Sequence, residues 1–279
     1  MNRRFAQVDV FSAQPTLGNP VAVVLDAEGL DDETMAAFAR WTNLSETTFV
    51  LPPTDPDADY RLRIFTPTGE LPFAGHPTLG SAHAWAQTTE RPVGDTVVQE
   101  CAIGLVRIRR SGPVAAFAAP PLRRSGPVDE DVVVAVAAAL RLGRDEIEAA
   151  EWVANGPEWL GVLLRSGEAV RAVRPDFAAL GTLEVGLVGP YSEQDPDDPV
   201  DVEVRAFAPA HGVPEDPVTG SLNAGLAVWL RSTDRVPASY VAAQGTVLGR
   251  AGRVRIDDDG TDIWVGGEST TVVAGTVDL

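Results

Sequence analysis

The chain contains no lysine, because all 22 of its positively charged residues are arginines. A Schiff base to pyridoxal phosphate or to a carbonyl substrate needs a lysine amine, so this route of covalent catalysis is excluded. Cysteine occurs once, at Cys101, which excludes an intrachain disulfide and a two-thiol acid–base pair. Any proton transfer by this chain must therefore use other groups.

Histidine is also scarce, with only His76, His83 and His211 in 279 residues. Neither a CxxC nor an HExxH motif is present, so we expect no histidine- or cysteine-rich metal site. A magnesium site made of carboxylates alone stays open. We assign no metal ligand.

The charge and the hydrophobic pattern narrow the range of partners. A net charge of −18 would repel nucleic acid and anionic membranes, so we expect neither as a partner.

The first 15 residues carry two arginines without an apolar segment behind them, and no apolar run of membrane-spanning length follows. With 44% hydrophobic and 22% charged residues, the composition is that of a globular domain. We expect a cytoplasmic location.

A stretch of the first half is repeated in the second. Residues 64–85 read IFTPTGELPFAGHPTLGSAHAW, and residues 206–229 read AFAPAHGVPEDPVTGSLNAGLAVW. Each copy leads from a strand-like run through prolines to a glycine-marked turn and then to a helical run rich in alanine and leucine. His76-Pro77 in the first copy corresponds to Asp216-Pro217 in the second. The repeat predicts two related domains.

The order of the elements predicts the α+β class. Many short strand-like runs surround few helical ones without regular alternation, which disfavours a doubly wound parallel sheet. We expect strands at 47–51, 60–65, 169–173, 263–265 and 270–277, and helices at 31–43, 78–87 and 220–230. Residues 118–128, rich in proline and glycine, are the expected linker. They separate an N-terminal domain, residues 1–120, from a C-terminal domain, residues 128–267.

Both glycine-marked turns could bind an anion. The first turn of a helix presents free backbone N–H groups and the positive end of the helix dipole. Two such turns, at Gly75–Gly80 and at Gly220-Ser221, could together hold a carboxylate. The alternative is structural, since glycine allows close packing and proline starts helices.

Three polar residues are candidates for acid–base chemistry. The pKa of His76 would ordinarily lie near neutrality, so it could donate or accept a proton, or it could simply bond the backbone of its turn. Asp216 precedes a proline, where an aspartate commonly caps a helix. Glu46 lies at the junction between an expected helix and strand, from which a side chain can point into a cleft; the alternative is a solvated surface position.

With these residues, the sequence resembles the PhzF-like family, the phenazine-biosynthesis isomerase group within the diaminopimelate-epimerase-like fold. The similarity extends from the first expected strand nearly to the last. The matching stretches are QVDVF (7–11), GNPVAVV (18–24), NLSETTFVL (43–51), RIFTPTGELPFAGHPTLG (63–80), EDPVTGS (215–221), QGTVLGR (244–250) and VGGES (265–269).

The resemblance implies two similar barrel-like domains, each a sheet around a central helix, with the active site in the cleft between them. The first domain would be completed by a C-terminal strand at about 268–279. Homodimers that need no cofactor are common in the family. The resemblance makes Glu46 the proton carrier, with His76 and Asp216 as polar groups near the reacting ring. Substrate would be bound by Asn19, Gly75, Gly220 and Ser221.

We therefore expect a cofactor-independent isomerase that moves a proton between carbons of a small carboxylate-bearing substrate, cyclic or like an amino acid. Burial is expected to raise the pKa of Glu46. Two alternatives stay open: an epimerase or racemase acting at one stereocentre, and a metabolite-binding protein that kept the fold without the reaction. The related epimerases use two cysteines, where this chain has His76 and Asp216. This difference favours the glutamate-centred isomerase.

Overall fold

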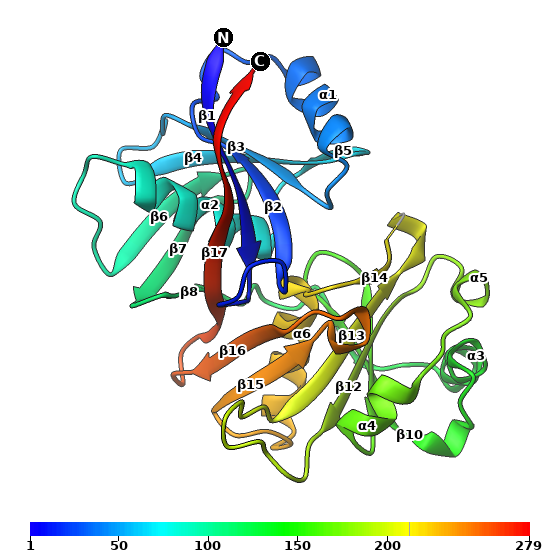
Figure 1. Ribbon diagram of the computed structural model, residues 1–279. Coiled ribbons are helices and arrows are strands. Elements are labelled where there is room, and N and C mark those ends of the chain that lie inside the picture. Colours follow the sequence, from blue (N-terminus) through cyan, green and yellow to red (C-terminus); the bar gives the residue numbers. More distant parts are fainter. Residues whose placement is uncertain (212) are drawn as a thin grey trace. The chain divides into compact units, whose positions relative to one another are not determined.

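The computed structural model describes residues 1–211 and 213–279, and the chain divides into two compact units. Unit 1 comprises Met1–Ala118 together with Gly266–Leu279, and unit 2 comprises Ala119–Val265. Figure 1 traces the chain through both units. Among the helices of the described residues, none has the length and apolar character needed to cross a membrane. The mixed α+β class is confirmed.

Unit 1, all of whose residues the structure describes, contains a closed ring of eight strands around a helix. The ring runs β1-β2-β3-β4-β6-β7-β8-β17, and β17 pairs back onto β1. Its pairs β2–β3 and β4–β6 are parallel. The strands are β1 (Asn2–Val10), β2 (Asn19–Val24), β3 (Thr47–Leu51), β4 (Tyr60–Thr66), β6 (Thr96–Cys101), β7 (Gly104–Ser111), β8 (Val114–Ala118) and β17 (Ile263–Asp278), and β5 (Gly69–Leu71) forms a hairpin with β4.

Helix α2 (Gly75–Thr88) lies inside this ring and packs on β1, β2, β3 and β8. Its small residues permit the close approach of strands: a Cβ built on Gly80 would lie 2.4 Å from Cγ1 of Val21. The helix begins three residues before the expected start at residue 78. Pro77 does not prevent this, because the N–H groups of a first helical turn have no intrahelical partner to lose.

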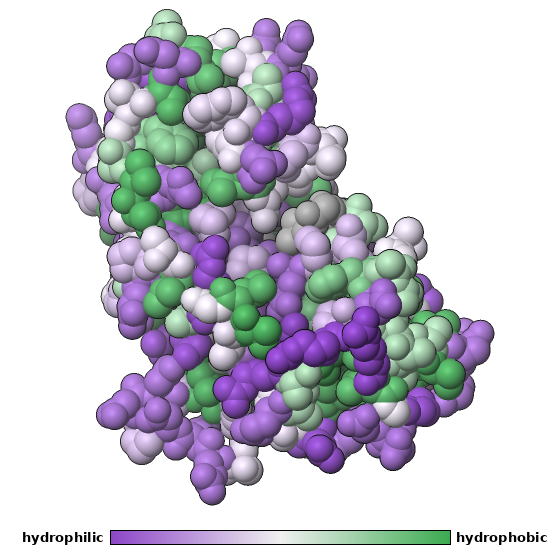
Figure 2. Space-filling model, turned by 45° about the vertical axis from the view of Figure 1, so that its right-hand side comes forward, coloured by the Kyte–Doolittle hydropathy of each residue, from purple (hydrophilic) through white to green (hydrophobic). Residues whose placement is uncertain are grey.

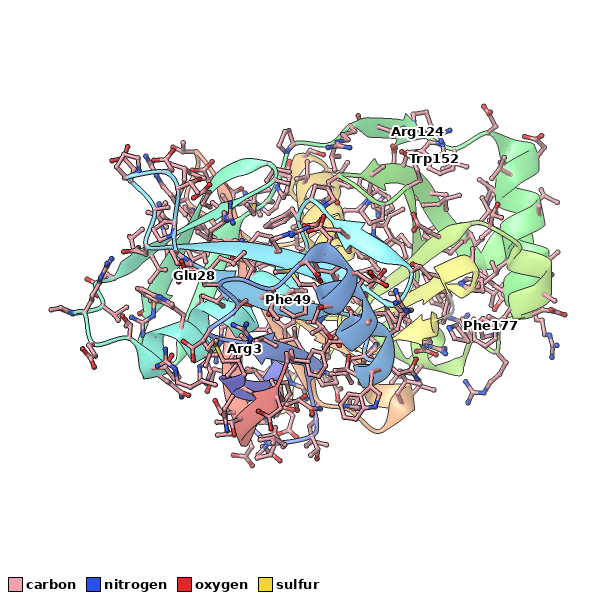
Figure 3. The ribbon with its side chains drawn as sticks, turned by 90° about the horizontal axis from the view of Figure 1, so that it is seen from above. Arg3, Glu28, Phe49, Arg124, Trp152 and Phe177 are labelled. Atoms are coloured by element: carbon pink, nitrogen blue, oxygen red, sulfur yellow. The ribbon has the colours of Figure 1, made fainter. Side chains whose placement is uncertain are left out.

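Helix α1 (Asp32–Thr42) packs against β3 and β4. It begins where Oδ1 of Asp31 accepts a hydrogen bond from the Thr34 amide, and it ends at Asn43 in the left-handed conformation. Its buried face joins an aromatic cluster in which Phe49 meets Phe38 and Phe65 edge to face. Phe49 is labelled in Figure 3.

In unit 2 the strands pack on a second central helix, α6 (Gly220–Ser232), which contacts β10, β11 and β16. Strands β9 to β13 pair in chain order, and β13 continues to β15 and β16. The strands are β9 (Arg124–Pro127), β10 (Ile147–Ala154), β11 (Trp159–Leu164), β12 (Glu184–Pro190), β13 (Val202–Ala208), β14 (Val213–Asp216), β15 (Ser239–Gln244) and β16 (Gly252–Asp258). Helices α3 (Glu130–Leu140), α4 (Gly167–Ala172) and α5 (Phe177–Leu180) and 3₁₀ turns η1 (Arg144–Glu146), η2 (Pro209–His211) and η3 (Thr246–Leu248) complete it.

The repeated sequence forms the same supersecondary structure in each unit. In unit 1, β4 pairs antiparallel with β5, and the chain then passes through α2 to β6, which pairs parallel with β4. In unit 2, β13 pairs antiparallel with β14, and the chain passes through α6 to β15, parallel to β13. The similarity of sequence therefore extends to strand order and direction.

Three expectations about secondary structure were wrong. Residues 169–173 belong largely to helix α4, not to a strand, because Ser166 caps the helix by accepting from the Ala169 amide. The expected linker contains β9, which pairs with β10, and Arg124 of β9 lies over the ring of Trp152 (Figure 3). The two expected closing strands are one strand, β17, because Gly266 lets β17 run close to β8: a Cβ there would lie 2.3 Å from the Ala115 carbonyl oxygen.

The surface carries both hydrophilic residues and a few large hydrophobic ones. On the face shown in Figure 2, hydrophilic residues predominate and hydrophobic ones form small groups among them. The exposed large hydrophobic residues include Trp41 and two neighbours on β17, Val272 and Val273.

Candidate active site

Asn19, Glu46 and His76 come together at one edge of the unit 1 ring. Asn19 is the first residue of β2, and Glu46 immediately precedes β3. Because β2 and β3 are parallel, their N-terminal ends lie at the same edge of the sheet. Helix α2 begins there as well, with His76 as its second residue. Residues distant in sequence are therefore placed together by the parallel pair and the enclosed helix.

His76 lies between the other two side chains. Its Nδ1 is 3.4 Å from Nδ2 of Asn19, and its Nε2 is 3.2 Å from Oε2 of Glu46. The side chains of His76 and Glu46 are 7% and 15% exposed, so the pair is shielded from solvent. Nε2 of His76 makes no well-aligned hydrogen bond within the described chain. Catalytic contacts commonly have such geometry until a substrate is bound.

Burial lowers the pKa of His76 to about 3, and the backbone carbonyl of Pro20 only partly opposes this effect. The imidazole is therefore neutral at neutral pH. The amide Nδ2 of Asn19 can only donate, so Nδ1 accepts and the ring proton lies on Nε2. From Nε2 the proton can be donated to the carboxylate of Glu46.

The N-terminus of α2 contributes backbone donors at the same edge. Its N-cap residue is Ala74, whose methyl side chain cannot accept a hydrogen bond from the first turn. Gly75 and His76 carry the first amides of the helix, Pro77 has none, and the Thr78 amide bonds the Ala74 carbonyl. This terminus has the chemistry of an anion-binding site.

The loop before Asn19 is held by a buried carboxylate that sequence reasoning missed. Asp9 is 1% exposed, and its Oδ2 accepts a hydrogen bond from the Gly18 amide at 2.8 Å. A Cβ on Gly18 would lie 2.3 Å from the Val10 carbonyl oxygen, so only glycine fits. Phe11, at the start of the loop, is buried with φ +64°, a strained conformation for a bulky residue. The hydrogen bond from Gly18 to Asp9 holds the end of the loop next to Asn19.

In unit 2, Asp216 ends β14 and does not cap α6, whose N-cap is Thr219. Asp216 Oδ2 accepts a hydrogen bond from the Thr219 hydroxyl at 2.5 Å. Gln244 binds the same segment, because its Oε1 accepts from the Thr219 amide and from Asn223 Nδ2, while its Nε2 donates to Thr219 Oγ1. The segment from Asp216 to the first turn of α6 is thereby fixed.

Gly220 and Ser221 are the first two residues of α6. The Ser221 hydroxyl accepts a hydrogen bond from Trp159 Nε1 at 3.0 Å, and the Ser221 carbonyl accepts one from Asn155. The serine side chain is therefore oriented by the adjacent β10–β11 region. Its equivalent in unit 1, Ser81, is bonded to Thr48 at 2.8 Å.

The other histidines have different surroundings. His83 Nε2 contacts the Thr271 hydroxyl at 3.0 Å, and burial, followed by the charge of Arg110, lowers its pKa. This is a structural role within unit 1. The side chain of His211 lies outside the described part of the chain. Within the described residues, no group of three His, Cys, Asp or Glu side chains is arranged to hold a metal ion.

A second buried carboxylate was also missed. Glu203 lies in β13, every residue of which is buried, and it accepts a hydrogen bond from the Tyr191 hydroxyl at 2.8 Å. Burial raises its pKa, although hydrogen bonds from Thr246 and Tyr191 oppose the shift. The segment VDVEVR alternates apolar and charged residues, which is typical of a strand with one face in solvent, so no local signal marks Glu203 as buried.

Comparison with known proteins places this chain in one family. The model of the family described as phenazine biosynthesis-like protein matches residues 8–275. A Pseudomonas aeruginosa trans-2,3-dihydro-3-hydroxyanthranilate isomerase is 36% identical over 90% of this chain and 88% of its own. The Schizosaccharomyces pombe protein antisense-enhancing sequence 1 is 36% identical over 97% of each chain. The crystal structure of a PhzF-family protein from Enterococcus faecalis superposes with a TM-score of 0.83, at 26% identity and full coverage of both chains.

Proposed function

The chain belongs to the phenazine biosynthesis-like protein family, and on this premise we propose that it is an isomerase that moves a proton between carbons of a small carboxylate-bearing substrate. Glu46 is the proposed proton carrier. The observation that supports this assignment is the shielded contact of Glu46 with a neutral His76, beside the uncapped first turn of α2. A cyclic amino acid such as trans-2,3-dihydro-3-hydroxyanthranilate is the first substrate to test.

The proposed reaction conserves atoms and electrons. The Glu46 carboxylate takes a proton from a ring carbon, and the C–H electron pair moves into the double bonds conjugated with the substrate carboxylate. The protonated Glu46 then returns the proton to a different carbon, so one C–H bond breaks, one forms and a double bond shifts. Positioned general acid–base catalysis of this kind contributes roughly 10²- to 10⁴-fold to a rate.

His76 is proposed to control the proton on Glu46. A neutral imidazole beside the carboxylate adds no charge, yet its Nε2–H can donate to the ionised form of Glu46. Asn19 positions the ring through Nδ1. The first backbone N–H groups of α2, at Gly75 and His76, and the positive end of the helix dipole would bind the substrate carboxylate.

For unit 2, the proposal rests on the family motif EDPVTGS and on local geometry. Asp216 is proposed as a polar group near the reacting ring, and Gly220 and Ser221 as further donors to substrate. The network of Thr219 and Gln244 holds all three in a defined segment. Asp216→Asn tests this role, because it keeps the shape of the side chain and removes its charge.

The test is an assay by NMR in D₂O, begun with trans-2,3-dihydro-3-hydroxyanthranilate and extended to cyclic and aromatic amino and hydroxy acids. We expect an isomer of unchanged composition with deuterium at the newly protonated carbon. Glu46→Gln should reduce the rate by about 10²-fold or more. The matched control, Glu33→Gln, removes an exposed carboxylate from α1 and should be as active as the wild type.

Full activity of Glu46→Gln would exclude Glu46 as the proton carrier. Deuterium at one carbon with inversion of that centre would instead make the protein an epimerase. Binding without turnover of any compound would favour a metabolite-binding protein.

A homodimer and a reaction without a metal or an organic cofactor are part of the proposal. Light scattering during gel filtration should give twice the 29.5 kDa chain mass. Dialysis against a chelator should leave the isomerase rate unchanged, and a rate restored only by added Mg²⁺ would contradict this expectation.

A further inference from the structure

Unit 1 contains a cavity of about 320 Å³ away from the candidate active site. It lies between the loop after β2, helix α1, the C-terminal end of β3 and the first half of β4. Leu30, Met35 and Leu51 give it an apolar wall, and Arg61 and Arg63 bring positive charge to it. Glu46 immediately precedes β3 and Leu51 is its last residue, so the two residues lie about 16 Å apart along the strand. The cavity is therefore separate from the Glu46–His76 pair.

Arg61 and Arg63 differ in the hydrogen bonds and ion pairs that they form. Arg63 is bound on both sides: Glu70 pairs with it in a bidentate contact at 2.7 Å, and Asp32 contacts it at 2.6 Å. Arg61 Nε is buried and makes no hydrogen bond with the described residues, and no ion pair there holds its guanidinium. A buried N–H group without a partner is uncommon and calls for an explanation.

Glu100, the acidic residue paired with Arg61 across the sheet, already has other hydrogen-bond donors. Glu100 lies opposite Arg61 in the parallel pairing of β4 and β6. Its carboxylate accepts hydrogen bonds from the Thr54 amide at 2.6 Å, the Thr54 hydroxyl and the Asp55 amide at 3.1 Å. Glu100 therefore attracts Arg61 only through space. The N–H groups of the Arg61 guanidinium can therefore donate to another acceptor.

The residues that line the cavity determine which kind of acceptor Arg61 can bind. A guanidinium presents a planar fork that matches a carboxylate with two parallel hydrogen bonds. The apolar wall requires a hydrophobic body next to the carboxylate, and the volume is at the small end of the range for ligand pockets, roughly 300–1,000 Å³. The nearby acidic groups Glu28, Asp32 and Glu70 disfavour a doubly charged phosphate. Glu28, labelled in Figure 3, is exposed, so water screens its charge.

We propose that this cavity is a second binding site, in which Arg61 binds the carboxylate of a small organic acid and Leu30, Met35 and Leu51 contact its apolar body. The site is independent of the proposed reaction, because it shares no residue with the Glu46–His76 edge.

Methionine NMR tests the proposal with benzoate as the probe. The chain has two methionines, so ¹³C-methyl labelling gives one signal from the cavity, Met35, and one from the exposed terminus, Met1. We expect benzoate to shift the Met35 signal saturably and to leave Met1 unchanged. Benzamide, which has the same shape without the charge, should bind at least tenfold more weakly.

Substitutions of Arg61 test whether this residue binds the carboxylate of benzoate. Arg61→Gln should weaken the Met35 response to benzoate at least tenfold, and Arg61→Lys, which keeps the charge but loses the fork, should weaken it severalfold. Arg107→Gln removes an exposed arginine from β7 and should respond as the wild type does. Glu46→Gln should also respond normally, so a failure of the proposed reaction would not affect this result.

Three results would overturn the proposal. The first is an unchanged Met35 signal in the presence of benzoate. The second is a response of Arg61→Gln and Arg61→Lys to benzoate equal to that of the wild type, and the third is a response to inorganic phosphate as strong as that to benzoate, which would make the cavity a site for inorganic anions.

Discussion

Arg205 forms a bidentate ion pair with Glu215 in the interior of unit 2, with Nε–Oε1 and Nη2–Oε2 distances of 2.9 and 2.7 Å. The two side chains are 3% and 8% exposed, and Arg205 also donates to the Val170 and Val173 carbonyls beside the end of α4. Arg63 makes the same bidentate contact with Glu70 in unit 1, where the side chains are 24% and 40% exposed. One interaction therefore recurs in two different solvent environments.

We expect these pairs to contribute very differently to stability. Arg205→Met would leave a buried, uncompensated Glu215 and should reduce the free energy of unfolding by about 3–5 kcal/mol. Arg63→Met, at the equivalent position, should cost about 1 kcal/mol or less, because water screens its partners. Urea unfolding of both variants measures the difference. Equal losses would show that burial does not determine the contribution of the pair.

The stability of the protein should fall on acidification because of His76. Its pKa is about 3 in the folded state and near 6.5 when unfolded, so between these values the unfolded state binds the extra proton. The contribution of His76 to stability is full above pH 6.5 and is lost as pH falls towards 3. Replacement by glutamine should reduce the slope of unfolding free energy against pH by up to about 1.4 kcal/mol per unit. Parallel curves for wild type and His76→Gln would contradict this prediction.

Glu203 should have the opposite pH dependence. Burial raises its pKa in the folded state, so the folded protein holds this proton more tightly than the unfolded chain does. Its contribution is therefore greatest below the unfolded pKa, about 4.3, and decreases as pH rises through the folded value. Glu203→Gln should remove this decrease, so the stability of the variant should rise relative to that of the wild type as pH increases above about 4.3. The exposed Glu148→Gln in β10 is the matched control, and an equal effect of both substitutions would exclude burial as the cause.

Gly266→Ala should be destabilising, since the added methyl would lie 2.3 Å from the Ala115 carbonyl oxygen and 2.5 Å from the Ala116 Cβ. Overpacking of this kind typically costs about 1–3 kcal/mol. Gly275→Ala in the same strand meets nothing within 4 Å and should change stability by about 0.5 kcal/mol or less. Urea midpoints of the two variants give the comparison. A neutral Gly266→Ala would mean that β17 and β8 can separate without loss.

Local patterns were sufficient where one short segment determines its own structure. Strand β3 occupies the expected residues 47–51, and α1 begins at an acidic cap and ends at Asn43 as its sequence indicates. Prediction was wrong at 169–173, because a short apolar run fits a buried strand and a buried helix equally well. It also divided β17 in two, because a glycine pair commonly ends a strand and the contact that requires Gly266 comes from β8.

The sequence by itself determined that chemistry based on lysine or on two thiols is absent. It also determined the repeat, the α+β class and the family, because each of these is a property of residue identity and order. Only the tertiary structure decided that Asn19, Glu46 and His76 share one edge, that His76 is kept neutral, and that Arg61 lies unbound in a cavity. Proximity and desolvation arise from strand pairing and packing between segments far apart in the chain, and no local pattern specifies them.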